Sequence, residues 1–390
     1  MLSSLKNLHA EFREIYRRDP RFFRAPGRVN LIGEHTDYSG GFVLPMAIER
    51  STTVAAAARK DRKILIRSMN LNESGEIDLD APEKKLRGSW LDFIEGMARI
   101  LERGNINLMG ADLLICSDVP SGAGLSSSAA LEISVGLALN EISGMPVDRV
   151  QLALAGQAAE HEFAGANVGI MDQYVSALGQ KGHALLIDCR SLEAEQIPLP
   201  TNEIVVVICD TKVKHDLAAS QYNLRRTECE KGVEILRSYL PGIGQLRDVS
   251  VTDFENHAGH LPEINRKRVR HVVTENERTL KAAESLKQND LNEFGRLMWL
   301  SHLSLRDDFE VSCLELDLLV DIASHCNGVL GGRMTGGGFG GSTVNLVRRK
   351  NVEDFIARIS NEYRRHTKIE PSVYVSNPAD GATELVDGNY

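Results

Sequence analysis

The chain has 390 residues, of which 42% are hydrophobic and 25% charged, and its formal net charge is −9. This length and apolar content suffice to bury a substantial core, and the length favours two domains over one. The negative charge argues against a protein that binds nucleic acid or a membrane surface electrostatically. The longest clear apolar run, Ile204–Cys209, is much shorter than the ~18 residues that a membrane-spanning helix needs.

The N-terminus and the cysteines both indicate a cytoplasmic protein. Residues 1–18 mix Lys, Glu and Arg with scattered leucines, which predicts an amphipathic helix and not a signal peptide. The six cysteines show no CxxC pair and no metal-ligand spacing, and three lie in apolar, strand-like contexts. Free buried thiols of this kind are typical of a reducing compartment. We expect a cytoplasmic monomer without nucleic-acid or membrane partners.

The first half of the chain alternates predicted strands and helices. Residues 51–67 predict two strands around a charged turn. A further strand, Asp112–Cys116, leads into a loop rich in glycine and serine, residues 119–128, and a helix follows because apolar residues recur on one helical face. Asp148 and the glutamine three residues later form a capping-box pattern, which predicts the start of a helix that carries Glu160.

A turn marked by prolines, Ile197–Pro200, joins two short apolar strands, Ala184–Asp188 and Glu203–Thr211. We place the domain boundary there, which gives an N-terminal domain of residues 1–200 and a C-terminal domain of residues 201–390. Beyond it, the patterns predict helices over 216–239, 264–287, 290–305 and 314–327, a glycine-rich loop, a strand over Ser342–Val347, a helix over about 352–366 and a strand over about 372–376. Two closely packed α+β domains fit this order best.

Three glycine-bearing segments stand out: Ala25–Tyr38, Val119–Ala130 and Gly331–Gly341. The middle segment places small residues and hydroxyls at the start of a helix, where unpaired backbone N–H groups and the helix dipole attract an anion. Its glycines let the backbone approach a phosphate closely. The first segment is polar and charged, as sugar sites are. A nucleotide site and a sugar site on one chain indicate a small-molecule kinase.

Other phosphate-binding patterns are excluded by inspection. The chain contains no Gly-Lys-Ser or Gly-Lys-Thr of a Walker P-loop, and it lacks the motif set of protein kinases. The glycines of Gly336–Gly341 match the dinucleotide-binding pattern, but a strand and not a helix is predicted to follow them. Taken alone, Gly331–Gly341 would indicate a flexible surface loop, and Gly122–Ser128 would equally suit a tight turn with a serine N-cap.

Together, in this order and at these separations, the three segments resemble the signature motifs of the GHMP kinase superfamily. Gly27–Tyr38 resembles the galactokinase signature, which other members lack, and Met171–Gln173, Lys214–His215 and Ser220–Arg226 also match galactokinases. The resemblance spans residues 20–376. It implies the α+β GHMP kinase fold, with a ribosomal S5 domain 2-like N-terminal domain, a ferredoxin-like C-terminal domain and an active site between them.

The resemblance implies an enzyme of the galactokinase family, with galactose and ATP as substrates and Mg²⁺ as cofactor. It would transfer the γ-phosphate of ATP to the C1 hydroxyl of α-D-galactose, giving galactose 1-phosphate and ADP. The residues implied to contact the nucleotide are Ser68, Gly122, Ala123, Gly124, Leu125, Ser126, Ser127 and Ser128. Mg²⁺ prefers oxygen ligands and keeps several waters; the ligands implied are Ser128 and Glu160. Without the family, these two would be a helix cap and part of a solvated helix face.

By similarity, Asp172 is the catalytic base and Arg28 its electrostatic partner. A carboxylate there can accept the proton of a sugar hydroxyl or hold that hydroxyl in line for attack. A guanidinium can stabilise the Asp172 anion, the incipient alkoxide or the transferring phosphoryl group. The sequence alone equally allows a buried ion pair.

The sugar site is implied within the first segment and at two later positions. A carboxylate can accept two hydroxyls, so acidic residues close together on a turn suit a sugar. A capping or solvated turn is the plainer interpretation of the same residues. The residues implied to line the sugar are Glu34, His35, Thr36, Asp37, Gly169 and Tyr222, the last near the 4-hydroxyl that distinguishes galactose from glucose.

Three alternatives accompany this interpretation. A related sugar 1-kinase would act on N-acetylgalactosamine, galacturonate or arabinose, although intact Glu34, Asp37 and Tyr222 favour unmodified galactose. A sugar- and ATP-sensing regulator on the same fold would have lost part of the serine stretch, which is intact at Ser126–Ala130. Another GHMP kinase, such as a mevalonate or homoserine enzyme, is disfavoured by Gly33–Asp37.

Overall fold

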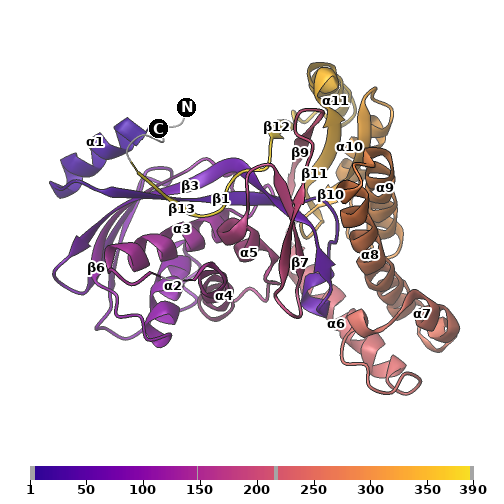
Figure 1. Cartoon of the computed structure of the whole chain (residues 1–390), viewed down its shortest axis with the longest axis horizontal. Helices are drawn as coiled ribbons and strands as arrows, with labels where there is room; N and C mark the ends of the chain where they lie inside the picture. Colours follow the sequence, from indigo (N-terminus) through magenta and orange to yellow (C-terminus); the bar gives the residue numbers. More distant parts are fainter. Residues whose placement is uncertain (1–4, 147, 215–217, 387–390) are drawn as a thin grey trace.

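The computed structural model describes residues 5–146, 148–214 and 218–386. Its first layer is a six-stranded sheet in the order β13-β1-β3-β6-β4-β5 (Figure 1). Neighbouring strands are antiparallel except β4 and β6, which are parallel. The strands are β1 (Arg21–Asn30), β3 (Pro45–Arg59), β4 (Lys63–Ser68), β5 (Glu73–Asp78), β6 (Gly110–Ser117) and β13 (Thr383–Leu385). The two strands predicted over 51–67 are confirmed as β3 and β4, but β6 lies between them.

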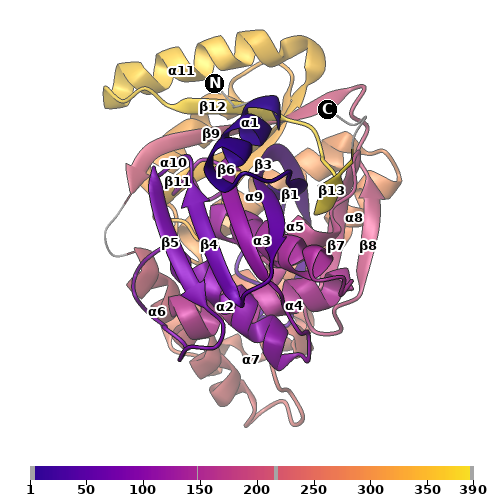
Figure 2. The ribbon, with the colours of Figure 1, turned by 90° about the vertical axis from the view of Figure 1, so that its left-hand side faces the viewer.

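Helices cover both faces of this sheet, because successive side chains of a strand point to opposite faces. On β1, Phe23 packs toward the helices below the sheet, whereas Phe22 packs against Leu8 and Phe12 of α1 above it (Figures 1 and 2). The lower helices are α2 (Leu91–Arg103), α3 (Ser127–Ile142), α4 (Arg149–Ala159) and α5 (Met171–Leu178), and the upper one is α1 (Leu5–Tyr16). The Asp148 side chain caps α4, so the predicted helix start is confirmed, but α4 ends at Ala159 and does not include Glu160.

The second part contains a four-stranded antiparallel sheet in the order β10-β11-β9-β12. Its central strand β9 is buried on both faces, which explains the continuous apolar run in the sequence. Val205 and Val207 pack toward α10 and α11, and Val206 and Ile208 pack toward α9. The strands are β9 (Ile204–Lys214), β10 (Val329–Thr335), β11 (Gly340–Arg348) and β12 (Ser372–Ser376), and the helices are α6 (Ala218–Leu236), α7 (Val251–His257), α8 (Glu263–Lys287), α9 (Leu291–Asp307), α10 (Leu314–Ser324) and α11 (Val352–Thr367).

Smaller elements complete the fold. A three-stranded sheet consists of β2 (Phe42–Val43), β7 (His183–Asp188) and β8 (Ala194–Pro198). The short helical turns are η1 (Asp37–Ser39), the π-turn η2 (Glu160–Ala164), η3 (Leu246–Asp248), η4 (Ala258–His260) and η5 (Arg349–Asn351). None of the helices in the described ranges is long and apolar enough to cross a membrane.

Two local predictions are corrected. The segment predicted as a proline turn between two strands contains the end of β8, which pairs with β7. The glycine-rich segment Gly331–Gly341 is not a flexible surface loop: its first half lies in β10, its end in β11, and only Gly336–Phe339 turns between them.

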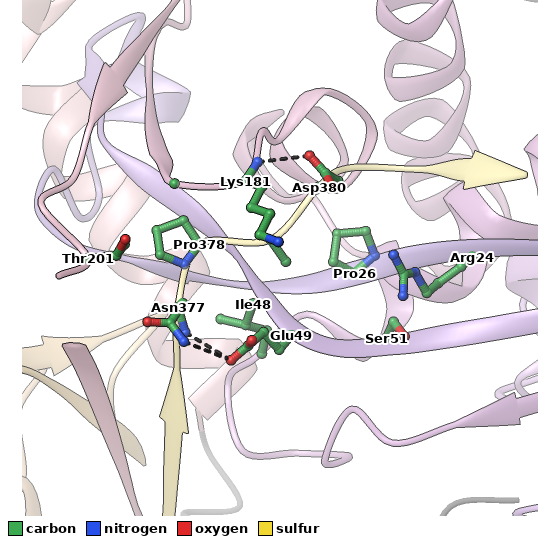
Figure 3. Close-up of a pocket in the computed structure, with 12 residues that line it drawn as sticks. Arg24, Pro26, Ile48, Glu49, Ser51, Lys181, Thr201, Asn377, Pro378 and Asp380 are labelled. Carbon is green, nitrogen blue, oxygen red and sulfur yellow. Dashed lines mark hydrogen bonds between the residues drawn. The ribbon is translucent and has the colours of Figure 1, made fainter. Parts of the chain in front are cut away.

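The segment after β12 connects the two large sheets. Asn377 hydrogen bonds to Glu49 of β3, and Asp380 accepts from the backbone N–H of Lys181, as Figure 3 shows. The chain then pairs as β13 with β1, so its last described strand belongs to the sheet of the first half. The division at residue 200 stays a prediction.

Candidate active site

The loop between β6 and α3 has the backbone of an anion site. Gly122, Gly124 and Ser126 have positive φ angles of 75°, 76° and 59°. Ala123 and Leu125 between them are buried, while the two glycines are exposed. The loop is anchored from behind, because Ser342 Oγ donates to the Ala123 carbonyl and the Arg28 N–H donates to the Leu125 carbonyl, at 2.7 and 3.1 Å. The exposed glycines and the start of α3 therefore offer backbone N–H groups suited to a phosphate.

Ser126 does not cap the following helix. Its side chain makes no capping hydrogen bond to α3. Its Oγ instead donates to Asp172 Oδ2 at 2.5 Å. The interpretation of this loop as a simple turn with a serine N-cap is therefore wrong, and the loop is joined directly to the predicted catalytic carboxylate.

Arg28 and Asp172 form a two-point ion pair. Arg28 Nε and Nη2 donate to the two carboxylate oxygens, each at 2.7 Å, and Nη1 donates to the Gly124 carbonyl at 2.6 Å. The Arg28 side chain is only 7% exposed, whereas that of Asp172 is 24% exposed. Such a bidentate pair fixes both side chains. The carboxylate is held between the loop and the cavity described next.

All of the predicted sugar residues except Thr36 line one cavity of about 150 Å³. It is lined by Arg28, Glu34, His35, Asp37, Val168, Gly169, Met171, Asp172, Tyr222, Gly336 and Gly337. The solvated-turn interpretation of Glu34 and His35 is wrong, because both side chains are buried. A larger cavity of about 640 Å³, lined by Glu49, Lys181 and Asn377 among others (Figure 3), lies apart from these residues.

Burial sets the charge of the cavity residues. It lowers the pKa of His35 to about 3, so this imidazole is neutral near pH 7. The His35 ring packs against Tyr222 and Phe309, with centroids 5.4 and 4.7 Å apart. Burial also raises the pKa of Asp37 to about 6, and the charges of Asp172 and Glu34 add to this shift. The cavity is therefore a desolvated site with several hydrogen-bond acceptors.

Gly169 is in close contact with Asp37. A Cβ atom at this glycine would lie 1.6 Å from Asp37 Oδ2. The absence of a side chain here thus decides where the Asp37 carboxylate can sit.

Ser128 and Glu160 face each other beside the loop. Ser128 Oγ lies 3.4 Å from Glu160 Oε1, and Gln173 Nε2 donates to Glu160 Oε2 at 2.7 Å. Glu160 is 8% exposed, so it is not on a solvated helix face; it lies in the π-turn that follows α4. Burial and the charge of Asp172 raise its pKa. A hydroxyl and a carboxylate oxygen fit Mg²⁺, and the described residues contain no cluster of three or more His, Cys, Asp or Glu arranged for a metal.

The remaining predicted residues lie outside the cavity lining. Thr36 is fully buried and donates to the carbonyls of Gly33 and Phe42, so it holds the turn together. Ser68 is buried at the end of β4, where it pairs in register with Ile115 of β6. His215, part of the motif before Tyr222, lies outside the described residues.

Sequence reasoning assigned no role to two side chains behind this site. Gln173 is fully buried and its Nε2 bridges Glu160 and Glu132, at 2.7 and 3.0 Å. Glu132 is also fully buried, and burial raises its pKa well above the usual range. Gln173 directly follows Asp172 and lies in the Met171–Gln173 stretch that resembles galactokinases, but no contact with Glu160 was predicted for it.

Comparison with known proteins identifies the family. Three family models match: the galactokinase galactose-binding signature over residues 10–58, the GHMP kinase N-terminal domain over 92–180 and the GHMP kinase C-terminal domain over 282–365. A galactokinase of Chloroflexus aggregans is 50% identical over 364 residues, 93% of each chain, and one of Roseiflexus is 45% identical over 381 residues, 97% of each chain. The chain belongs to the galactokinase family.

Solved structures agree with this assignment. A Lactococcus lactis galactokinase complexed with galactose has a TM-score of 0.94 at 37% identity, covering 98% of this chain and 100% of that one. A mevalonate kinase from Methanococcus jannaschii has a TM-score of 0.65 at 20% identity, covering 93% and 100% of the two chains, which shows a shared fold alone. The GHMP kinase fold, the galactokinase family and the ATP-dependent sugar kinase class predicted from the sequence are confirmed.

Proposed function

We propose that this chain transfers the γ-phosphate of ATP to the C1 hydroxyl of α-D-galactose, with Asp172 as the residue that accepts or orients the hydroxyl proton. The observation that carries the proposal is the position of this carboxylate. It lines the sugar cavity and is held from behind by Ser126 of the phosphate loop and by Arg28. A donor phosphate on the loop and an acceptor hydroxyl in the cavity would meet at Asp172.

The roles of the residues follow from their contacts. Phosphoryl transfer depends mainly on positioning and on neutralising charge. The exposed peptides of Gly122 and Gly124 would bind the triphosphate, and Arg28 would stabilise negative charge that develops beside Asp172. Ser128 and Glu160 would hold Mg²⁺, which offsets the charge of the phosphates when bound. Asp172 would hold the C1 hydroxyl in line and take up its proton.

The direct test is ADP release with ATP and Mg²⁺ across galactose, glucose, N-acetylgalactosamine, galacturonate, arabinose and mevalonate. We expect the highest kcat/KM with galactose, and ³¹P NMR should place the phosphate on C1. A higher kcat/KM with another sugar would show that galactose is not the preferred substrate. It would leave the assignment of the phosphate loop unchanged. Binding of galactose and ATP without turnover would support the sensor alternative.

Glu160→Gln should raise the Mg²⁺ concentration needed for half-maximal activity by at least ~10-fold, because a neutral amide is a weaker ligand for a hard cation. The measurement is the activity as a function of free Mg²⁺ at saturating substrates. Glu162→Gln is the matched control, since Glu162 is on the same turn but is exposed and pairs with Arg103. Equal Mg²⁺ requirements in both variants would remove Glu160 from the metal site.

The raised pKa of Asp37 predicts that kcat/KM for galactose falls at acidic pH. Because burial raises this pKa to about 6, the carboxyl gains a proton as the pH falls through 6 and loses its negative charge and part of its capacity to accept from sugar hydroxyls. We expect kcat/KM for galactose to decline below about pH 6, since this ratio reports groups of the free enzyme. In Asp37→Asn the value should be lower throughout and this decline should be absent. A decline that persists in the variant would assign it to another group.

We also propose a reducing, cytoplasmic setting and a monomeric state. Cys209, Cys229 and Cys326 are buried and form no disulfide, and burial raises the pKa of the Cys209 thiol to about 12, which suits inert structural thiols. Light scattering at micromolar concentration tests the oligomeric state.

A further inference from the structure

We propose that the end of strand β10 positions Glu34 for reading a sugar hydroxyl, which gives the third glycine-rich segment a role in substrate specificity. We call Arg333, Thr335 and Gly336 the β10 clamp. The inference rests on the proposed function, since it assumes that the cavity holds a sugar.

The clamp acts on only one oxygen of the Glu34 carboxylate. The Gly336 N–H donates to Oε1 at 2.7 Å, Thr335 Oγ1 lies 3.1 Å from it, and Arg333 Nη1 lies 3.5 Å from it. Among the described residues, no hydrogen bond is made to Oε2, and Glu34 lines the cavity. The Gly336 N–H and the Thr335 hydroxyl, which lies equally close to the Asn30 carbonyl, occupy the lone pairs of Oε1, so Oε2 is the oxygen left for a ligand hydroxyl.

The clamp is itself fixed from behind. Arg333 is fully buried; its Nε donates to Ser301 Oγ at 3.1 Å and its Nη1 to the Asn30 carbonyl at 3.0 Å. Ser301 donates in turn to Glu275 Oε1 at 2.5 Å, and this same oxygen accepts from the Gly33 N–H at 3.0 Å. The backbone N–H of Gly33, the residue before Glu34, and the carboxylate of Glu34 are therefore tied to one buried network. A network of this kind restricts Glu34 to one orientation.

The turn that begins at Gly336 of the clamp also lies close to the phosphate loop. A Cβ at Gly336 would lie 3.6 Å from the Gly124 carbonyl, and one at Gly337 would lie 3.5 Å from the Tyr222 ring. Gly336 has a φ of +84°, a conformation that favours glycine, and its N–H is the shortest donor to Glu34. This turn therefore lies next to the phosphate loop, the Glu34 carboxylate and the Tyr222 ring.

Thr335→Val tests the clamp with little change in shape. It removes the hydroxyl beside Oε1 and should weaken galactose binding about tenfold, the usual effect of losing one hydrogen bond to a charged group. Galactose and its 2-, 3-, 4- and 6-deoxy analogues are titrated by calorimetry into wild type, Thr335→Val and Glu34→Gln. Thr335→Ser retains the hydroxyl and is the matched control, and thermal unfolding checks each variant. Ser301→Ala, which loosens Arg333, is the second variant if Thr335→Val does not fold.

The deoxy sugars separate positioning from a general structural effect. The analogue that lacks the hydroxyl read by Glu34 should bind equally well to wild type and Glu34→Gln, and the penalty of Thr335→Val should vanish for that same analogue. A Thr335→Val penalty that is equal for all five sugars, or no penalty at all, would overturn the clamp. If Glu34→Gln leaves galactose binding unchanged, the sugar site of the proposed function fails instead, and the clamp fails with it.

Discussion

Asp172→Asn is expected to reduce turnover by at least ~10²-fold while leaving ATP binding largely intact. Removal of a positioned general base typically costs a factor of 10²–10⁴. An amide keeps the shape of the side chain but cannot take up the proton of the C1 hydroxyl. It also weakens the two-point contact with Arg28, which holds the residue against the phosphate loop. The measurements are kcat under saturating substrates and the Kd of an ATP analogue by calorimetry.

Loss of an ion pair alone could also impair the enzyme, and a control separates the two effects. Asp92 is a buried aspartate that pairs with Arg87 at 2.7 Å, at the start of α2. Asp92→Asn should lower stability with little change in kcat. If Asp172→Asn kept normal turnover, or lost no more activity than Asp92→Asn, the assignment of Asp172 as the base would be wrong.

Local patterns in the sequence were sufficient to predict most of the elements. The strand Asp112–Cys116, the loop after it and the apolar helix that follows form as expected, because their signals lie within one short window. The order of the strands within the sheets could not be predicted from such local patterns. The parallel pairing of β4 with β6 joins strands separated by more than 40 residues, and β13 pairs with β1 across most of the chain.

Residue roles that depend on burial were the least predictable. Glu160 and the two residues after it form a charged stretch that suggests a solvated face, yet Glu160 is buried at the start of the π-turn that follows α4. Likewise, the seven glycines of residues 331–341 suggest a loop, whereas four of them lie in a sheet. Whether a residue is buried depends on partners that lie elsewhere in the sequence. Glu160, for example, contacts Gln173, and Gly336 contacts Glu34. Only the family resemblance drew attention to Glu160 before the structure.

Gly169→Ala is expected to raise the KM for galactose by roughly 10- to 100-fold, with a much smaller effect on the KM for ATP. The added methyl would lie 1.6 Å from Asp37 Oδ2, so one of the two groups must move. The group that moves with least cost is the Asp37 carboxylate, since it is the end of a side chain and not backbone. Its displacement removes a charged acceptor from the cavity, and losing such a hydrogen bond costs about 1.5–3 kcal/mol.

The effect of Gly169→Ala should be confined to sugar binding, because Gly169 is not in the positive-φ region and alanine can adopt its backbone conformation. The melting temperature is therefore expected to stay within a few degrees of wild type. Gly259→Ala is the control: this glycine is exposed with no atom within 4 Å of the added methyl, so both KM values should be unchanged. Steady-state kinetics with each substrate varied in turn measures all four values. A normal galactose KM in Gly169→Ala would show that Asp37 does not contact the sugar, and the cavity would then have to bind it through Glu34, His35 and Tyr222 alone.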